Sequence, residues 1–282
     1  MNILRWGRNP SLQNIIVIIE IYKGEIMSIE EKIIKIAQEQ YDIQKREEQS
    51  NVSKVNEFEL YPHIFFLSCV VDSGNSDTAW NLIQEISKHF GPEFMRFYNA
   101  VKDNNKELNK YLKTVSSRNN DKWFKQAVIK INNDYDGNIS KLWDDAKNCA
   151  DIISKCLEFK GVGIKKATMI TNILTRAYYK DKKTEDKSSI DISPDVHVKR
   201  AMYRLNLVKC ESIDDYNKID SNLFIYKARA INPKFPGLLD FAFWRIGKDK
   251  ICQNDKCMSG VINEKNKKIE CPFESFCLKK GI

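Results

Sequence analysis

The sequence predicts an all-α protein with two helical lobes, and three observations support this prediction. Apolar residues recur at helical spacing through most of the chain, and no strand-like alternation persists. A chain of 282 residues is long enough to bury one large core or two modest ones. Four of the eight cysteines fall in the last thirty-one residues, which marks the C-terminal end as a separate cysteine loop.

The first 27 residues do not have the pattern of a folded element. Residues 14–22, NIIVIIEIY, resemble a signal peptide, but Glu20 interrupts the apolar run and no small-residue cleavage site follows. The codons for Lys-Gly-Glu just before Met27 can form a purine-rich ribosome-binding sequence. We therefore expect translation to start at Met27, and residues 1–27 to be a non-native or disordered extension.

From residue 28 onward the pattern indicates helices joined by polar segments. An amphipathic helix over 28–48 buries Ile33, Ile34 and Ile36, is capped by Ser28, and is followed by a polar linker over 49–59. Further helices are predicted over 61–71 (central and buried), 78–90, 92–101, 106–115, 122–135, 139–150, 196–207, 212–224 and 238–247. The aromatic side chains assigned to the core are Phe65, Phe66, Trp123, Trp143, Phe241 and Trp244. Residues 180–190 are charged and predict a surface insertion.

The net charge of +8, with a pI of about 8.9, fits a polyanionic partner. A lysine-rich proteome would give the same balance, so charge alone leaves both readings open. No apolar run reaches membrane-spanning length, so we expect a soluble protein in the cytoplasm.

The stretch 150–179 has two helical patterns that meet across the turn Phe159-Lys160-Gly161-Val162-Gly163. Glycines let another backbone approach closely, and free N–H groups at the start of the second helix can bind an anion. Gly161, Val162 and Gly163 are therefore candidates for phosphate binding, although a tight helix connection would have the same pattern. Lys165 and Lys166 follow, about 100° apart around the helix, so we expect only one of them to face a given cleft.

The C-terminal cysteines have the spacing C-x4-C-x13-C-x5-C, formed by Cys252, Cys257, Cys271 and Cys277. Without a secretory signal, a metal site is a better interpretation than a disulfide framework. Structural zinc usually uses a C-x2-C pair, which this spacing lacks. The remaining cysteines, which we interpret as packed thiols, are Cys69, Cys149, Cys156 and Cys210.

The order of these motifs resembles the helix-hairpin-helix DNA glycosylases, in the endonuclease III-like branch with a cluster loop. The motifs are FKGVGIKKA, PDVHVKRAMYRLNLV, DFAFWRIG and the cysteines. The resemblance covers roughly residues 55–282 and is specific only after about residue 157. It implies a six-helix barrel lobe over 60–185 that ends in the hairpin, and a second lobe of 28–59 plus 186–282 that carries the metal.

The resemblance also implies roles for individual residues. The catalytic lysine of the family falls on Lys165 and its catalytic aspartate on Asp195, with Lys166 and His197 as DNA contacts beside the glycine turn. His197 could equally be a packed structural histidine, and Asp195 could only cap the helix that begins near Val196.

Several positions depart from the family pattern. Lys160 stands where the family has a hairpin proline, and Pro194 replaces an apolar residue. Lys165 and Asp195 are thirty residues apart, a longer separation than expected, and Asp191 is a rival carboxylate. No glutamine marks the residue that fills the duplex gap; Asn75 is one candidate.

By this resemblance the protein would be a base-excision-repair DNA glycosylase with AP lyase activity. It would flip a nucleotide, cleave its N-glycosidic bond and nick the strand by β-elimination through a lysine Schiff base. The alternatives are a monofunctional glycosylase and a non-catalytic DNA- or damage-binding protein. The partner would be double-stranded DNA with a damaged, mismatched or modified base or an abasic site, bound by a monomer associated with a bacterial or archaeal nucleoid.

The family's cluster loop also ends in C-x5-C, which matches Cys271 and Cys277, and holds a [4Fe-4S] cluster with a structural role. Zinc is the alternative cofactor, and a loop without metal is the third reading. Lysines in the long middle spacer could approach phosphates or simply be solvated; they are Lys265, Lys267 and Lys268.

Overall fold

The computed structural model describes residues 27–55, 61–72, 76–91, 93–114, 120–177, 185–209, 215–253, 256–263 and 266–277. Within these ranges the chain is mostly helical, and strand-like pairing is limited to two isolated bridges, Cys252–Cys257 and Ile262–Lys268. The all-α prediction is therefore confirmed. Residues 1–26 of the predicted extension lie outside the described residues, as do Asn75, Cys210 and Lys265.

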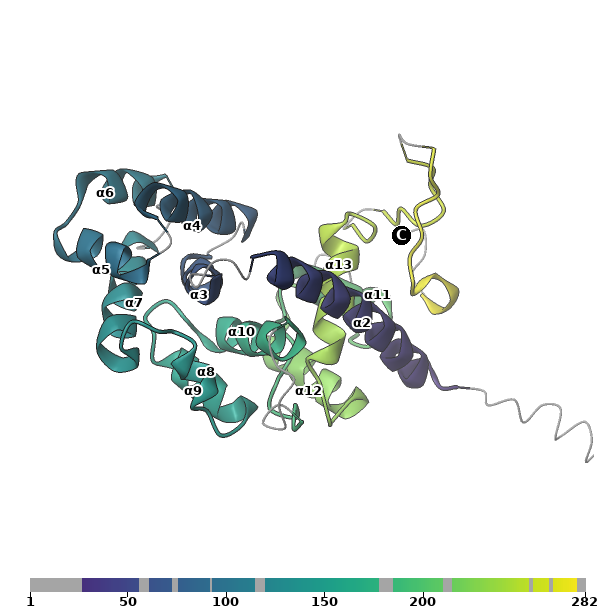
Figure 1. Ribbon diagram of the computed structural model, residues 1–282. Helices are drawn as coiled ribbons and strands as arrows, with labels where there is room; N and C mark the ends of the chain where they lie inside the picture. Colours follow the sequence, from purple (N-terminus) through teal and green to yellow (C-terminus); the bar gives the residue numbers. More distant parts are fainter. Residues whose placement is uncertain are drawn as a thin grey trace, which may run out of the picture.

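The helices follow one another in a single order along the chain (Figure 1). They are α2 (Ile29–Val55), α3 (Tyr61–Val71), α4 (Ser76–Phe90), α5 (Phe94–Lys102), α6 (Lys106–Lys113), α7 (Asn120–Tyr135), α8 (Lys141–Asp144), α9 (Cys149–Leu157), α10 (Ile164–Ala177), α11 (Val196–Arg204), α12 (Ser221–Ile231), α13 (Leu238–Lys248) and the 3₁₀ turn η2 (Glu274–Phe276). None of these helices combines the length and the apolar composition that crossing a membrane would require.

Helix α2 begins at the predicted cap but ends later than predicted. Ser28 Oγ accepts a hydrogen bond from the Glu31 backbone N–H (3.1 Å), and Glu31 Oε2 accepts one from the Ser28 N–H (2.7 Å). This reciprocal pair satisfies two N–H groups that a helix start otherwise leaves free. The predicted linker over 49–59 is wrong up to Val55, because that stretch contains neither glycine nor proline to end the helix.

Helix α12 corrects a second boundary. The predicted helix over 212–224 is instead a run of turns at 215–219 followed by a helix that begins at Ser221 and continues to Ile231. Asp220 is its N-cap, since its side chain accepts a hydrogen bond from the Asn222 N–H at 3.0 Å. An aspartate that we had placed inside a helix therefore marks its start.

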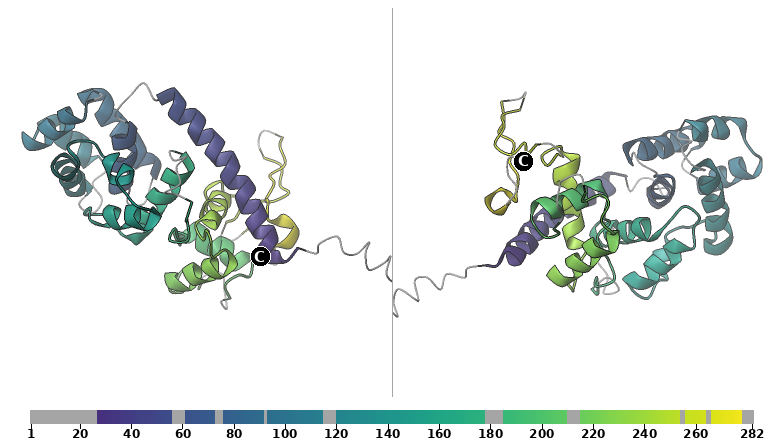
Figure 2. Two further views of the ribbon diagram at one scale, coloured as in Figure 1. Left: turned by 60° about the horizontal axis from the view of Figure 1, so that its bottom comes forward. Right: turned by 180° about the vertical axis from the view of Figure 1, so that it is seen from behind.

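Buried apolar side chains form two clusters. One draws its members from 64–174, and the other from 33–41, Cys149 and 190–273. In Figure 1, α3 to α7 lie on one side, α2 and α11 to α13 on the other, and α10 between them. Helix α13 packs on α11 and α2, an arrangement that the two views in Figure 2 also show. Cys69, Cys149 and Cys156 are buried, as predicted.

Candidate active site

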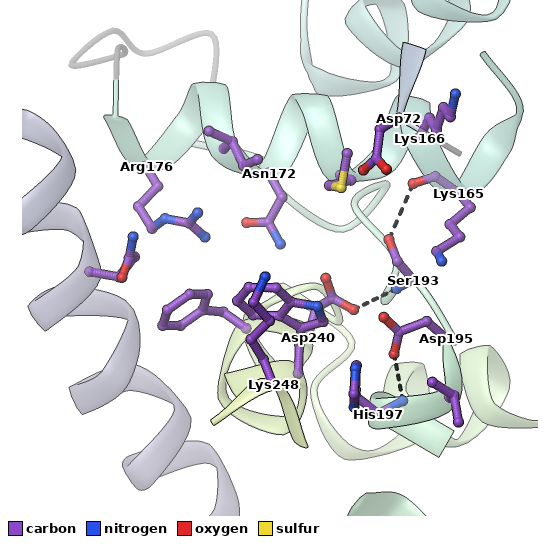
Figure 3. A pocket seen from close by; sticks show the side chains of 16 residues that line it. Asp72, Lys165, Lys166, Asn172, Arg176, Ser193, Asp195, His197, Asp240 and Lys248 are labelled. Carbon is purple, nitrogen blue, oxygen red and sulfur yellow. Dashed lines mark hydrogen bonds between the residues drawn. The ribbon is translucent and has the colours of Figure 1, made fainter. Parts of the chain in front are cut away.

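A cavity of about 650 Å³ lies where α10, the segment 191–197, α13 and α2 meet. Both Lys165 and Asp195 line it, although thirty residues separate them in sequence. Figure 3 shows side chains from these elements converging on the cavity. The other predicted site residues in its wall are Lys166 and His197.

The turn before α10 is shaped by contact with Trp123. Gly161 has φ +86°, a left-handed conformation that side chains rarely adopt, and a Cβ there would lie 2.5 Å from Trp123 Cδ2. Val162 is buried, whereas a Cβ on Gly163 would meet no atom within 4 Å. Of the three predicted phosphate-binding residues, Gly163 is therefore the one whose backbone is open to a ligand.

The two lysines after the turn point in different directions. Lys166 donates to the Val70 carbonyl (2.7 Å) and lies over the Trp123 ring, 5.5 Å from its centroid. Burial lowers the pKa of Lys166, which also fits a packed role. Lys165 is exposed, its amine is directed toward Ser193 and Asp195 in Figure 3, and it forms no ion pair with another described residue. Both lysines line the cavity, so our expectation of one was wrong, but only Lys165 has an amine available there.

Asp195 is the N-cap of α11. Its Oδ1 accepts hydrogen bonds from the His197 and Val198 backbone N–H groups, both at 2.9 Å. Capping uses one carboxylate oxygen, so the other can serve the cavity. The rival Asp191 is bound at both oxygens by Arg229, each at 2.7 Å, and it is not part of the cavity wall.

Asp240, in the first turn of α13, is a cavity residue that the sequence analysis missed. Its Oδ1 accepts a hydrogen bond from the Ser193 N–H at 2.6 Å, and Ser193 Oγ in turn donates to the Lys165 carbonyl at 3.2 Å. Burial raises the pKa of the Asp240 carboxyl to about 7, and nearby Asp195 adds to this rise. The only signal in the sequence was a single acidic residue in the apolar run LLDFAFW.

Aromatic and basic side chains complete the wall. Phe241 and Trp244 are only partly buried and line the cavity, so assigning them to the core was wrong. Arg176 is 4% exposed, and its guanidinium lies 5.0 Å from the Phe241 ring centroid. The Asn172 amide donates to the Gly237 carbonyl at 2.8 Å, while its own oxygen accepts no hydrogen bond.

The four C-terminal cysteines line a second, much smaller cavity of about 20 Å³ beside Arg204 and apolar side chains of α11 and α13. Burial raises the pKa of Cys271 to about 12 and also raises that of Cys252, so without a cation both are neutral thiols. Across the part of the chain that the structure describes, no three His, Cys, Asp or Glu side chains are arranged to hold a metal ion. The donor set suits a thiolate-binding metal, but the loop must open to admit a cluster.

Comparison with protein-family models, with curated proteins and with solved structures finds no match to this chain. The functional argument therefore rests on the cavity and on the motifs that the sequence carries.

The two glycines of the turn give a matched pair for a stability test. Gly161→Ala combines a disfavoured φ with a clash against Trp123, so we expect it to lower the free energy of unfolding by about 2–4 kcal/mol. Gly163→Ala has neither problem and should stay within about 0.5 kcal/mol of wild type. Urea denaturation of both variants measures the difference, and equal stabilities would refute the packing of the turn on Trp123.

The raised pKa of Asp240 predicts a pH-dependent effect of Asp240→Asn. The folded state binds this proton more tightly than the unfolded chain, so this carboxyl makes folding less favourable as pH rises from about 4 to about 7. Relative to wild type, the uncharged Asn variant should therefore gain stability between pH 5 and pH 8. Denaturation of both proteins at several pH values tests this; a difference that does not change with pH would contradict it.

Proposed function

We propose that the protein is a DNA glycosylase with AP lyase activity, of the helix-hairpin-helix type that its sequence resembles. The observation that carries this proposal is the convergence of the Lys165 amine and the Asp195 carboxylate on one cavity. An enzyme of this kind extrudes a nucleotide from the duplex, because the bond it must break is inaccessible within the base stack. The cavity has room for an extruded nucleoside, since ligand pockets commonly measure about 300–1,000 Å³.

Asp195 stabilises the positive charge that develops on the sugar as the glycosidic bond breaks. Its capping hydrogen bonds fix the carboxylate at the start of α11 and leave one oxygen for the sugar. Preorganisation of this kind is effective because the charged group need not move during the reaction.

Lys165 acts as the nucleophile in its neutral form. Its nitrogen bonds to C1′ of the deoxyribose as the base departs, and loss of a proton from nitrogen with opening of the ring gives a Schiff base. Removal of a proton from C2′ then expels the 3′ phosphate and nicks the strand. The exposed backbone at Gly163, just before α10, holds a neighbouring phosphate, since helix N-termini favour anions.

The cavity wall has the composition of a site for a nucleobase. Phe241 and Trp244 offer ring faces on which a base can stack. Asn172, Arg176 and Asp240 offer polar atoms to its edge. This combination favours an enzyme over a protein that contacts only the DNA backbone.

The proposal includes a metal centre held by Cys252, Cys257, Cys271 and Cys277. The C-x5-C ending and the absence of a C-x2-C pair favour a [4Fe-4S] cluster, with zinc as the alternative. The centre would supply rigidity to the loop rather than chemistry to the cavity.

Borohydride trapping on a duplex with an abasic site tests the lyase chemistry. Wild type should be captured covalently, and Lys165→Ala should lose capture completely because the Schiff-base nitrogen is gone. Lys160→Ala, which removes an exposed lysine of the same turn, is the matched control and should be captured normally. Wild type that cannot be trapped would end the lyase proposal.

The same experiment separates the alternatives when base release is also measured. Asp195→Asn keeps a good capping residue and removes the charge, so base release should fall roughly 100-fold. If Lys165→Ala leaves base release unchanged, the enzyme is monofunctional. If wild type neither releases a base nor is trapped, yet binds DNA in a salt-sensitive way, the protein is a binding protein only.

Analysis of the purified protein tests the metal centre. We expect brown protein with equal amounts of iron and sulfide, and loss of both in Cys271→Ser. Cys156→Ala, which removes a buried thiol of the other cluster, should keep them. Colourless protein with zinc would replace iron–sulfur by zinc, and protein with neither metal would refute the centre.

A further inference from the structure

The histidine of the cavity is held by an arginine of its own helix. His197 and Arg200 lie one turn apart on α11, and Arg200 Nη2 is 2.9 Å from His197 Nδ1. A guanidinium can only donate hydrogen bonds, so Nδ1 must be the acceptor and carries no proton. The ring hydrogen is therefore on Nε2, and the imidazole is neutral while this bond is made.

Helix α13 fixes the same ring from the other side. A Cβ added to Gly247 would lie 2.6 Å from both Cβ and Nδ1 of His197, so the ring rests directly on the backbone of α13. Arg200 is only 7% exposed, and its guanidinium also bonds to Tyr216. Neither the ring nor the guanidinium is thus free to reorient, and Nε2–H is the polar group that His197 can offer to the cavity.

The charges around His197 also favour the neutral ring. Burial is the main cause of its lowered pKa, and three cations act in the same direction: Arg200 on α11, Lys165 on α10 and Lys248 on α13. Asp195, at the start of α11, opposes them.

We propose that Arg200 is a positioning residue that fixes His197 as a neutral Nε2–H donor to a phosphate oxygen of the bound DNA strand. This inference rests on the proposed function, because it takes DNA as the ligand of the cavity. It differs from an ordinary histidine–phosphate ion pair in two measurable ways. A neutral donor displaces no counterion, and its contribution does not depend on protonation near neutral pH.

The first test needs no DNA. Nitrogen-15 NMR of histidine-labelled wild type should show His197 as the Nε2–H tautomer between about pH 5.5 and 8, in the range where an ordinary histidine titrates. Arg200→Lys keeps a donor and should keep this tautomer, whereas Arg200→Met should lose it. A protonated ring, or a hydrogen on Nδ1 in wild type, overturns the proposal even if every Arg200 variant fails to fold.

The second test measures binding to a duplex with a tetrahydrofuran abasic-site analogue, which the enzyme cannot cleave. His197→Ala should weaken binding about 10-fold or more, as expected for a hydrogen bond to a charged group, without changing the slope of log K against log salt. His197→Gln places an amide N–H near Nε2 and should recover part of the loss. Unchanged affinity in His197→Ala, or a salt slope reduced by about 0.9, overturns the neutral-donor role.

These results are independent of catalysis. If borohydride trapping fails but the tautomer and the salt behaviour hold, the glycosylase proposal falls and the mode of DNA binding remains. If trapping succeeds while either test fails, only the role of Arg200 and His197 is lost.

Discussion

The cavity depends on the two hydrogen bonds of Ser193. Its hydroxyl donates to the Lys165 carbonyl on α10, and its N–H donates to the Asp240 carboxyl on α13. The extended segment 191–195 has no regular secondary structure of its own, so these bonds and the caps at its ends set its path. Because Asp195 lies two residues after Ser193, the same bonds determine how closely its carboxylate approaches the Lys165 amine. A local hydrogen-bond pattern thus links three segments that are distant in sequence.

Glycines at both ends of α13 allow this close approach. The Gly237 N–H donates to the Ile190 carbonyl at 2.7 Å, and a Cβ there would be 2.7 Å from the Ile190 side chain. At the other end, Gly247 lies against His197. A side chain at either position would push α13 away from the segment that carries Asp195. Two residues without side chains therefore matter as much to the cavity as the residues that line it.

Sequence reasoning located the helices and the motif residues but not the composition of the cavity. Helical periodicity and the Ser28 cap depend on neighbours in sequence, and these predictions held. Phe241 and Trp244 were misassigned because an apolar side chain has the same periodicity whether it faces a core or a cavity. Asp240 and Arg176 were missed for a related reason: each gains its role from partners on other helices, and no short motif records those contacts. The boundary at Asp220 failed because a capping aspartate and an internal one look alike in sequence.

The two carboxyl groups of the cavity lie in environments that separate their chemistry. Asp240 is surrounded by protein, and burial raises its pKa to about 7, so near neutral pH much of it is protonated and can both donate and accept a hydrogen bond. The negative charge of Asp195 is instead stabilised by two backbone N–H groups at a helix start. Acid–base roles are commonly divided in this way, by environment rather than by residue type. With Lys165, Arg176 and Lys248 also in the wall, the cavity carries excess positive charge, and Asp195 provides a localised negative charge within it. That arrangement suits a ligand whose phosphates are anionic while its sugar becomes cationic during the reaction, and for this reason we favour cleavage of a nucleotide over binding alone.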